Sequence, residues 1–130
     1  MKNFLLIAIA SILVIGMMSC GLYTRYVDRD YFKEDGGIVI DKSVKNNDGT
    51  WFLPIKFETR IINSAHVIAD ISACTKNNTI TMRVLIGLAQ AGHKWPEGVN
   101  LGKLSDGVYQ IKYLNSDGST PDIDKIEINN

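Results

Sequence analysis

Hydrophobic and polar residues alternate along most of this chain after an apolar N-terminal run. The alternation is clearest in residues 51–62 and 79–88. A period of two predicts strands that bury one face and expose the other. The side chains expected on the core faces are Leu53, Ile55, Phe57 and Ile61 in the first strand and Ile80, Met82, Val84, Ile86 and Leu88 in the second. Pro54 has no backbone donor, which predicts a sheet edge or a bulge at its end of the strand.

Shorter apolar runs predict three more strands, at residues 37–44, 108–114 and 123–128. The sequences between them are typical of turns. Residues 46–49 read Asn-Asn-Asp-Gly, and residues 115–119 read Asn-Ser-Asp-Gly-Ser. Asp-Gly favours turns because glycine accepts positive φ without steric cost.

Residues 65–75 fit two patterns. Val67, Ala69, Ile71 and Ala73 alternate as in a strand, whereas Val67, Ile68, Ile71 and Cys74 would share a helix face. We predict a strand, because residues 76–78 form a short turn into the strand at residues 79–88 and the two strands then make a hairpin.

Two segments carry no regular pattern. Residues 22–37 are charged and aromatic, and they suit either an irregular first strand packed on the domain or aromatic rings at a lipid headgroup boundary. We slightly favour the strand. Residues 89–104 contain Gly92, Pro96, Gly98 and Gly102, which predict a long loop without regular structure.

Six or seven short strands separated by turns indicate an all-β sandwich, with a small β-barrel as the alternative. The run Asp-Gly-Val-Tyr-Gln-Ile-Lys-Tyr at residues 106–113 resembles the penultimate strand of immunoglobulin-like sandwiches, which opens with Gly-x-Tyr. The Cys-Trp-Cys framework of true immunoglobulin domains is not found in the sequence.

The N-terminus has the organisation of an export signal. Lys2 precedes a run at residues 4–18 that is apolar apart from Ser11 and Gly16. This run is shorter than the ~20 residues that a spanning helix needs. A positive end followed by a short apolar run predicts a signal helix.

The end of this run resembles the lipobox of bacterial lipoproteins, with the sequence Met17-Met18-Ser19-Cys20. The resemblance implies cleavage between Ser19 and Cys20 and a lipid on the Cys20 sulfur. It divides the chain into a signal peptide at 1–19, a lipidated cysteine and tether at 20–36, and a β-sandwich at 37–130. Gly21, in place of Asp, implies an outer-membrane location facing the periplasm. The alternative is cleavage by the ordinary signal peptidase, which would release a soluble secreted protein.

The charges are balanced, with 14 Lys and Arg against 14 Asp and Glu. A nucleic-acid partner favours a basic face, so we expect none. Membrane attachment through a basic patch is not expected either, so lipid on Cys20 is the predicted anchor.

No short motif identifies a reaction. His66 and His93 lie outside metal-binding spacings, and Asp117, Asp122 and Asp124 fit turn formers better than a calcium loop. Cys74 is expected to be a buried structural thiol. We therefore predict a protein that is not an enzyme and that uses no cofactor or metal.

Two functions remain. The first is a lipid-anchored protein-binding module, such as a periplasmic inhibitor or immunity protein, and the second is a structural accessory of an envelope, secretion or pilus assembly. The candidate binding residues are His93, Lys94, Trp95 and Glu97. Trp95 offers the large apolar face that dominates many interfaces. Its alternative role is a lid over one open end of the core.

Overall fold

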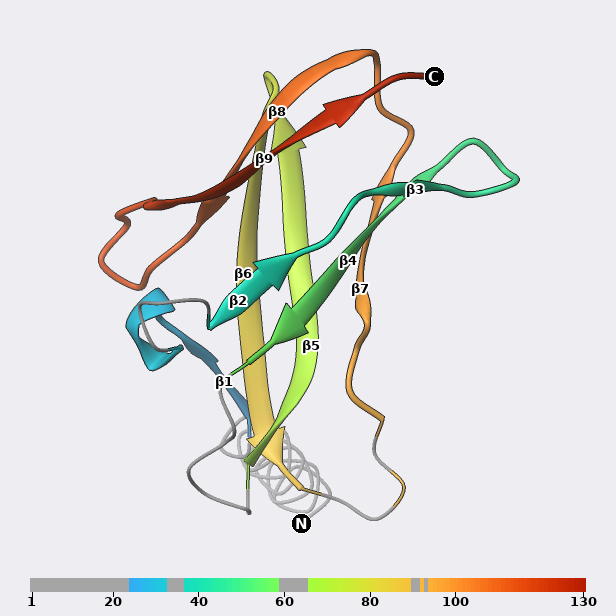
Figure 1. The fold of residues 1–130 in the computed structure, drawn as a ribbon. Helices are drawn as coiled ribbons and strands as arrows, with labels where there is room; N and C mark the ends of the chain where they lie inside the picture. Colours follow the sequence, from blue (N-terminus) through green and yellow to red (C-terminus); the bar gives the residue numbers. More distant parts are fainter. Residues whose placement is uncertain (1–23, 33–36, 59–65, 90–91, 93) are drawn as a thin grey trace, which may run out of the picture.

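A computed structural model describes residues 24–32, 37–58, 66–89, 92 and 94–130 of the chain. These residues form nine strands and one short 3-10 helix (Figure 1). The elements are β1 (Thr24–Val27), η1 (Arg29–Tyr31), β2 (Ile38–Ile40), β3 (Val44–Lys45), β4 (Trp51–Phe57), β5 (His66–Lys76), β6 (Thr79–Leu88), β7 (Gly98–Gly102), β8 (Gly107–Tyr113) and β9 (Asp122–Ile128). The predicted signal helix, Ser19 and Cys20 lie outside the described residues.

The first sheet is built around β6. On one side β6 pairs with β5 along a long antiparallel hairpin. On the other side β6 pairs with two strands in succession, β8 in parallel at Thr79–Met82 and β1 in antiparallel at Val84–Gly87. β9 pairs with the far edge of β8. The ends of β1 and β8 therefore meet beside the middle of β6.

The second sheet is built around β4. β7 pairs with one side of β4. β2 and β3 also pair with β4, at different positions along its length. Pro54 lies inside this central strand and not at a sheet edge, whereas the bulge that we predicted as the alternative is found near this end of β4, where the register against β7 shifts between Trp51 and Phe52. The Pro54 carbonyl accepts a hydrogen bond from Asp41 N at 3.1 Å, in the break between β2 and β3. Proline has no backbone N–H, and at this break between the two strands no partner strand needs one.

The two sheets share one hydrophobic core and do not close into a barrel within the described residues, which confirms the predicted sandwich. The expected core positions within β4 and β6 are buried, apart from Leu88, which is exposed at the end of β6, and Phe57, which is partly buried. Ile61, the fourth core position predicted for the first strand, lies outside the described residues. Tyr109, Ile111 and Tyr113 bury the inner face of β8. Tyr109 Oη also donates to Ser105 O at 2.8 Å, a local feature shared with the tyrosine corner of immunoglobulin-like domains.

β5 confirms the strand prediction at residues 65–75 and explains the ambiguity of its sequence. The register against β6 shifts between Ile68 and Asp70. This bulge adds one residue, so Ile68 and Ile71 are both buried although they stand three positions apart. A spacing of three mimics a helix face. The hairpin turn uses Asn77 and Asn78, which both have positive φ.

The N-terminal part of the described chain belongs to the fold. β1 is the irregular first strand that we favoured, and Phe32 is buried in the core against Phe57 and Tyr113. The sandwich therefore includes residues 24–32, which the sequence had assigned to the tether. Asp28 holds this segment to the β8–β9 loop, since its two carboxylate oxygens accept hydrogen bonds from Ser116 N and Oγ at 2.8 and 2.9 Å.

Candidate functional site

The segment that carries the candidate residues is more regular than predicted. We expected residues 89–104 to lack regular structure, but Gly98–Gly102 forms β7. Glycine permits this strand. A Cβ at Gly98 would lie 2.1 Å from Leu53 O, so only a residue without a side chain lets β7 approach β4. We interpreted these glycines as breaks in regular structure, whereas Gly98 is required for β7 to pair with β4.

Trp95 lies outside the hydrophobic core, and 41% of its surface is exposed. The structure therefore does not support the lid over the core. Lys94 and Glu97 are also exposed, and His93 lies outside the described residues. The segment is attached to β4 by its backbone, because Glu97 O accepts a hydrogen bond from Ile55 N at 3.0 Å. Its side chains remain free to contact other molecules.

Trp95 borders a groove on the outer face of the second sheet. The groove has a volume of about 860 Å³ and is lined by Asp41, Val44, Asn46, Phe52, Pro54, Ile55, Lys56, Phe57, Trp95, Pro96 and Glu97. We call it the β4 groove. Val44 is 53% exposed, so two of the large exposed apolar side chains among the described residues meet here.

The lining of the β4 groove includes the charged residues Asp41, Lys56 and Glu97. Lys56 Nζ is 3.1 Å from Asp41 Oδ2, and both side chains are largely exposed. Such a pair contributes little to stability because water screens it. The groove thus combines apolar and charged side chains, both of which occur in protein-binding surfaces.

The sequence held a signal for this groove that we did not use. Phe52 and Pro54 share the outward parity of Lys56, on the face that the alternation predicts to be exposed to solvent. An apolar pair on a face expected to be polar indicates a contact surface. The groove joins these residues to Trp95 only because β7 pairs with β4, and that pairing was not predicted.

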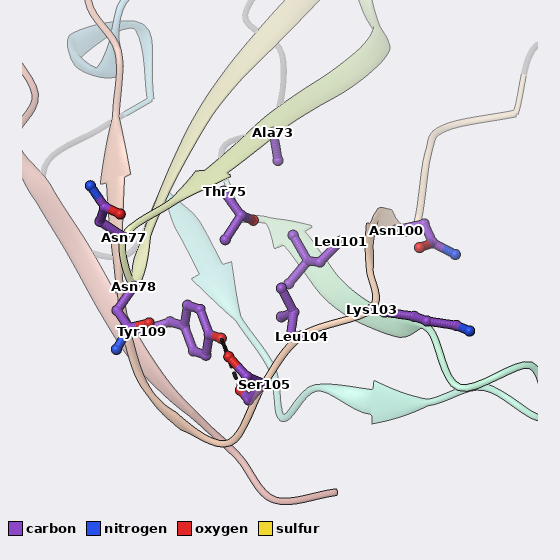
Figure 2. A pocket seen from close by; sticks show the side chains of 10 residues that line it. All are labelled: Ala73, Thr75, Asn77, Asn78, Asn100, Leu101, Lys103, Leu104, Ser105 and Tyr109. Carbon is purple, nitrogen blue, oxygen red and sulfur yellow. Dashed lines mark hydrogen bonds between the residues drawn. The ribbon is translucent and has the colours of Figure 1, made fainter.

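A second hollow, of about 430 Å³, lies between the β5–β6 turn and the β7–β8 connection (Figure 2). Some of its polar groups are engaged within the protein. The Tyr109 hydroxyl donates to Ser105 O, and the Asn100 amide oxygen accepts from Gly102 N at 2.8 Å. Lys103 extends away from Tyr109 in this view. We do not assign this hollow as the binding site.

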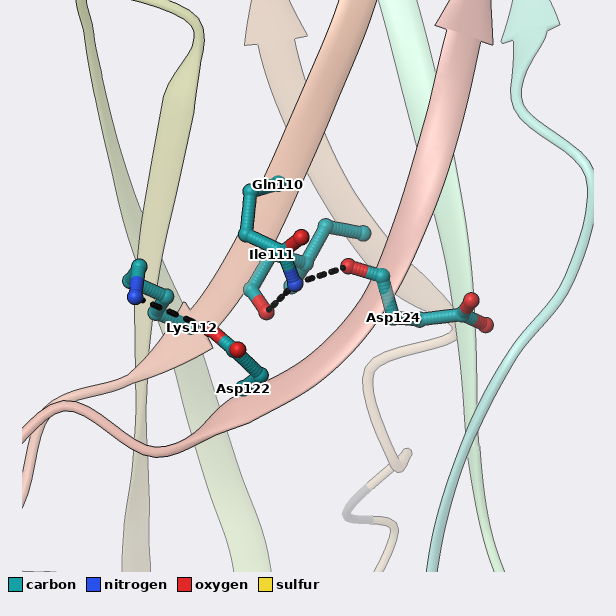
Figure 3. Close-up of polar contacts among 5 residues, drawn as sticks. All are labelled: Gln110, Ile111, Lys112, Asp122 and Asp124. Atoms are coloured by element: carbon teal, nitrogen blue, oxygen red, sulfur yellow. Dashed lines mark hydrogen bonds and ion pairs between the residues drawn. The ribbon is translucent and has the colours of Figure 1, made fainter.

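The acidic residues near the last turn serve local structure. Asp117 accepts hydrogen bonds from Ser119 N and Oγ, which confirms it as a turn former. Asp122 pairs with Lys112 at 2.9 Å, and Gln110 Nε2 donates to Asp124 O at 2.9 Å across β8 and β9 (Figure 3). Within the described residues, no three His, Cys, Asp or Glu side chains are grouped to hold a metal ion.

The expectation for Cys74 is wrong, because its side chain is exposed. Ala73 occupies the inward position of β5, so Cys74 points to the outer face of the first sheet.

Searches of protein families, of curated proteins and of solved structures found no match to this chain. Among the residues that the structure describes, no helix is long and apolar enough to cross a membrane.

Proposed function

We propose that this chain is a lipid-anchored lipoprotein of the bacterial cell envelope and acts as a non-catalytic protein-binding module. The β4 groove is the proposed docking surface, with Trp95 as its central contact. The observation that carries the proposal is the exposure of Trp95 beside the outward-facing Phe52 and Pro54. Tryptophan contributes more binding energy in protein interfaces than most residues do.

The anchor would hold this module close to the membrane. Cys20 stands four residues before Thr24, where β1 begins (24 − 20 = 4). Four extended residues span at most about 14 Å. A partner of the β4 groove would therefore be met near the lipid surface, which suits an inhibitor or immunity protein placed where a foreign enzyme acts.

The anchor is tested by fractionation of cells that carry Cys20→Ser. The variant should leave the membrane fraction or accumulate with its signal peptide uncleaved, because no lipid can be attached to serine. A variant that is processed normally and stays in the membrane fraction would refute lipid anchoring at this position.

The docking surface is tested by cross-linking in living cells with a photoreactive amino acid at position 95. Position 108 is the matched control, since Val108 is a 56% exposed apolar residue on the other sheet. We expect one discrete protein adduct from position 95 and none of that mass from position 108. The same adduct from both positions, or no protein adduct, would remove the β4 groove as the binding site.

The cross-link also separates the two functions that the sequence left open. A single adduct of one partner chain supports an inhibitor or immunity protein. A series of adducts that sediments with a large membrane complex would instead support a structural accessory of an envelope assembly.

A further inference from the structure

Arg83 occupies the break in the first sheet. On one side of β6, Met82 pairs with Tyr113 at the end of β8, and Val84 pairs with Val27 at the end of β1. Arg83 stands between these two pairs and has no strand partner on that side. Elsewhere along β6 a paired strand fills the space beside it, and at Arg83 that space is left open.

The inner side of the break is filled by the phenol of Tyr113. Its hydroxyl donates to Val27 O and accepts from Val84 N at 3.2 Å. Among the described residues no comparable group fills the outer side, where Arg83 and its neighbours face away from the core. The outer side therefore remains a hollow of about 280 Å³, lined in part by Tyr26, Ser72, Cys74, Thr81, Arg83 and Leu114.

The guanidinium of Arg83 has unused donors in this hollow. It stacks on Tyr26 at 4.4 Å from the ring centroid, and its Nε is buried without a hydrogen-bond partner in the part of the chain that the structure describes. Among the described residues no carboxylate lies within ion-pair distance of Arg83. Nearby Asp28 already accepts two hydrogen bonds from Ser116. A buried donor without a hydrogen-bond partner requires an explanation.

We propose that the hollow at Arg83 binds an oxyanion. The planar guanidinium offers paired N–H donors that match the oxygens of a phosphate or carboxylate. The hydroxyls of Ser72 and Thr81 stand on the same face as Arg83, and Tyr26 holds the guanidinium plane in place. The oxyanion belongs either to a small molecule or to a lipid headgroup. This site is independent of the β4 groove, which lies on the other sheet.

The test follows the Arg83 Nε–H resonance of the ¹⁵N-labelled full chain in uncharged detergent micelles. Inorganic phosphate is titrated against sodium chloride at matched ionic strength. The expected result is a saturable shift of this resonance with phosphate and none with chloride. Arg83→Lys, which identifies the resonance by its loss, should weaken phosphate binding about tenfold, as measured on neighbouring amide signals, because lysine lacks the fork.

Arg25→Gln is the matched control, since Arg25 is an exposed arginine on β1, and it should leave phosphate binding unchanged. A second arm adds phosphatidylglycerol to the micelles and compares it with a neutral diacylglycerol. A saturable shift only with phosphatidylglycerol assigns the oxyanion to a lipid headgroup. The proposal is overturned if neither oxyanion gives a saturable shift, if chloride has the same effect, or if Arg83→Lys binds as tightly as the original chain.

Discussion

At the scale of single residues, Gly98 decides whether the β4 groove exists. An added Cβ would meet Leu53 O at 2.1 Å and Phe52 Cζ at 2.8 Å. Gly98→Ala should therefore lower the free energy of unfolding by at least about 2 kcal/mol, as overpacking does. Urea denaturation measures the change. Gly92→Ala is the control, because a Cβ there meets nothing within 4 Å and costs only the ~1 kcal/mol of its positive φ. Equal losses would contradict the assigned close approach.

Tyr113 gives a second prediction at this scale. Its hydroxyl joins β1 to β6, so Tyr113→Phe should cost about 1–3 kcal/mol by leaving Val27 O and Val84 N without this partner. Burial raises the pKa of Tyr113 from 10.0 to about 12. A raised pKa means stability that is present below pH 10 and is lost as the pH rises towards 12. Denaturation at several alkaline pH values should show this loss in the original chain and a smaller one in Tyr113→Phe. Identical alkaline profiles would contradict it.

The sequence pattern predicted which residues are buried but not the hydrogen bonds that they make. In the strand predicted at residues 108–114, Tyr113 shares one face with Tyr109 and Ile111, and the structure buries that face. The pattern gave no indication of the hydrogen bond from Tyr113 to Val27, which is 86 positions away. Alternation reports which face of a strand is buried, whereas the partner of a polar atom depends on how distant strands are arranged.

At the scale of elements, two turns share one design. Residues 46–50 and 115–119 both read Asn-x-Asp-Gly-Thr/Ser. In each, the aspartate accepts hydrogen bonds from the backbone and hydroxyl of the last residue, and the first residue donates its backbone N–H to the carbonyl of the last. The short strands on either side are thus joined by the same closed turn.

These turns predict that the stability of the fold decreases at acidic pH. Hydrogen bonds from Thr50 and Ser119 lower the pKa of Asp48 and of Asp117 below 3.8. A lowered pKa means stability that is present above pH 3.8 and is lost as the pH falls through the folded pKa. The double variant Asp48→Asn, Asp117→Asn should lose less stability between about pH 4 and pH 2 in thermal melts. A slope as steep as that of the original chain would refute this role.

Strands with simple alternation were predicted well, as at β6 and β8. Departures arose where a residue acts against its usual tendency. Gly98 supports a strand, and Pro54 sits in a central one. Both depend on neighbouring strands whose position the local sequence does not contain.

A similar local hydrogen bond of an aspartate is found on two edge strands of the first sheet. On the edge strands β5 and β9, an aspartate accepts a hydrogen bond from the next backbone N–H: Asp70 from Ile71 at 2.8 Å, and Asp124 from Lys125 at 2.7 Å. A charged side chain placed there discourages pairing with a foreign strand. These edges are therefore poor sites for the addition of a foreign strand.

At the scale of the whole molecule, the Arg83 hollow and the β4 groove are each formed by segments that are distant in the sequence. β1 and β8 meet at Arg83, and residues 94–97 come to lie over β4. The sequence predicted Trp95 as a contact residue from its type and its glycine-rich surroundings, but not the apolar floor that accompanies it. It gave no indication of the Arg83 hollow, because the break in the sheet arises only when β8 pairs in parallel with β6.

The most direct test of the account is the affinity of the cross-linked partner for the original chain and for Trp95→Ala. We expect a loss of about 30-fold or more, which corresponds to the ~2 kcal/mol of an interface hot spot. Val108→Ala should bind as tightly as the original chain. The melting temperature of Trp95→Ala should stay nearly unchanged, because Trp95 lies outside the core. Equal affinity of Trp95→Ala and the original chain would contradict the proposal that the β4 groove is the binding surface.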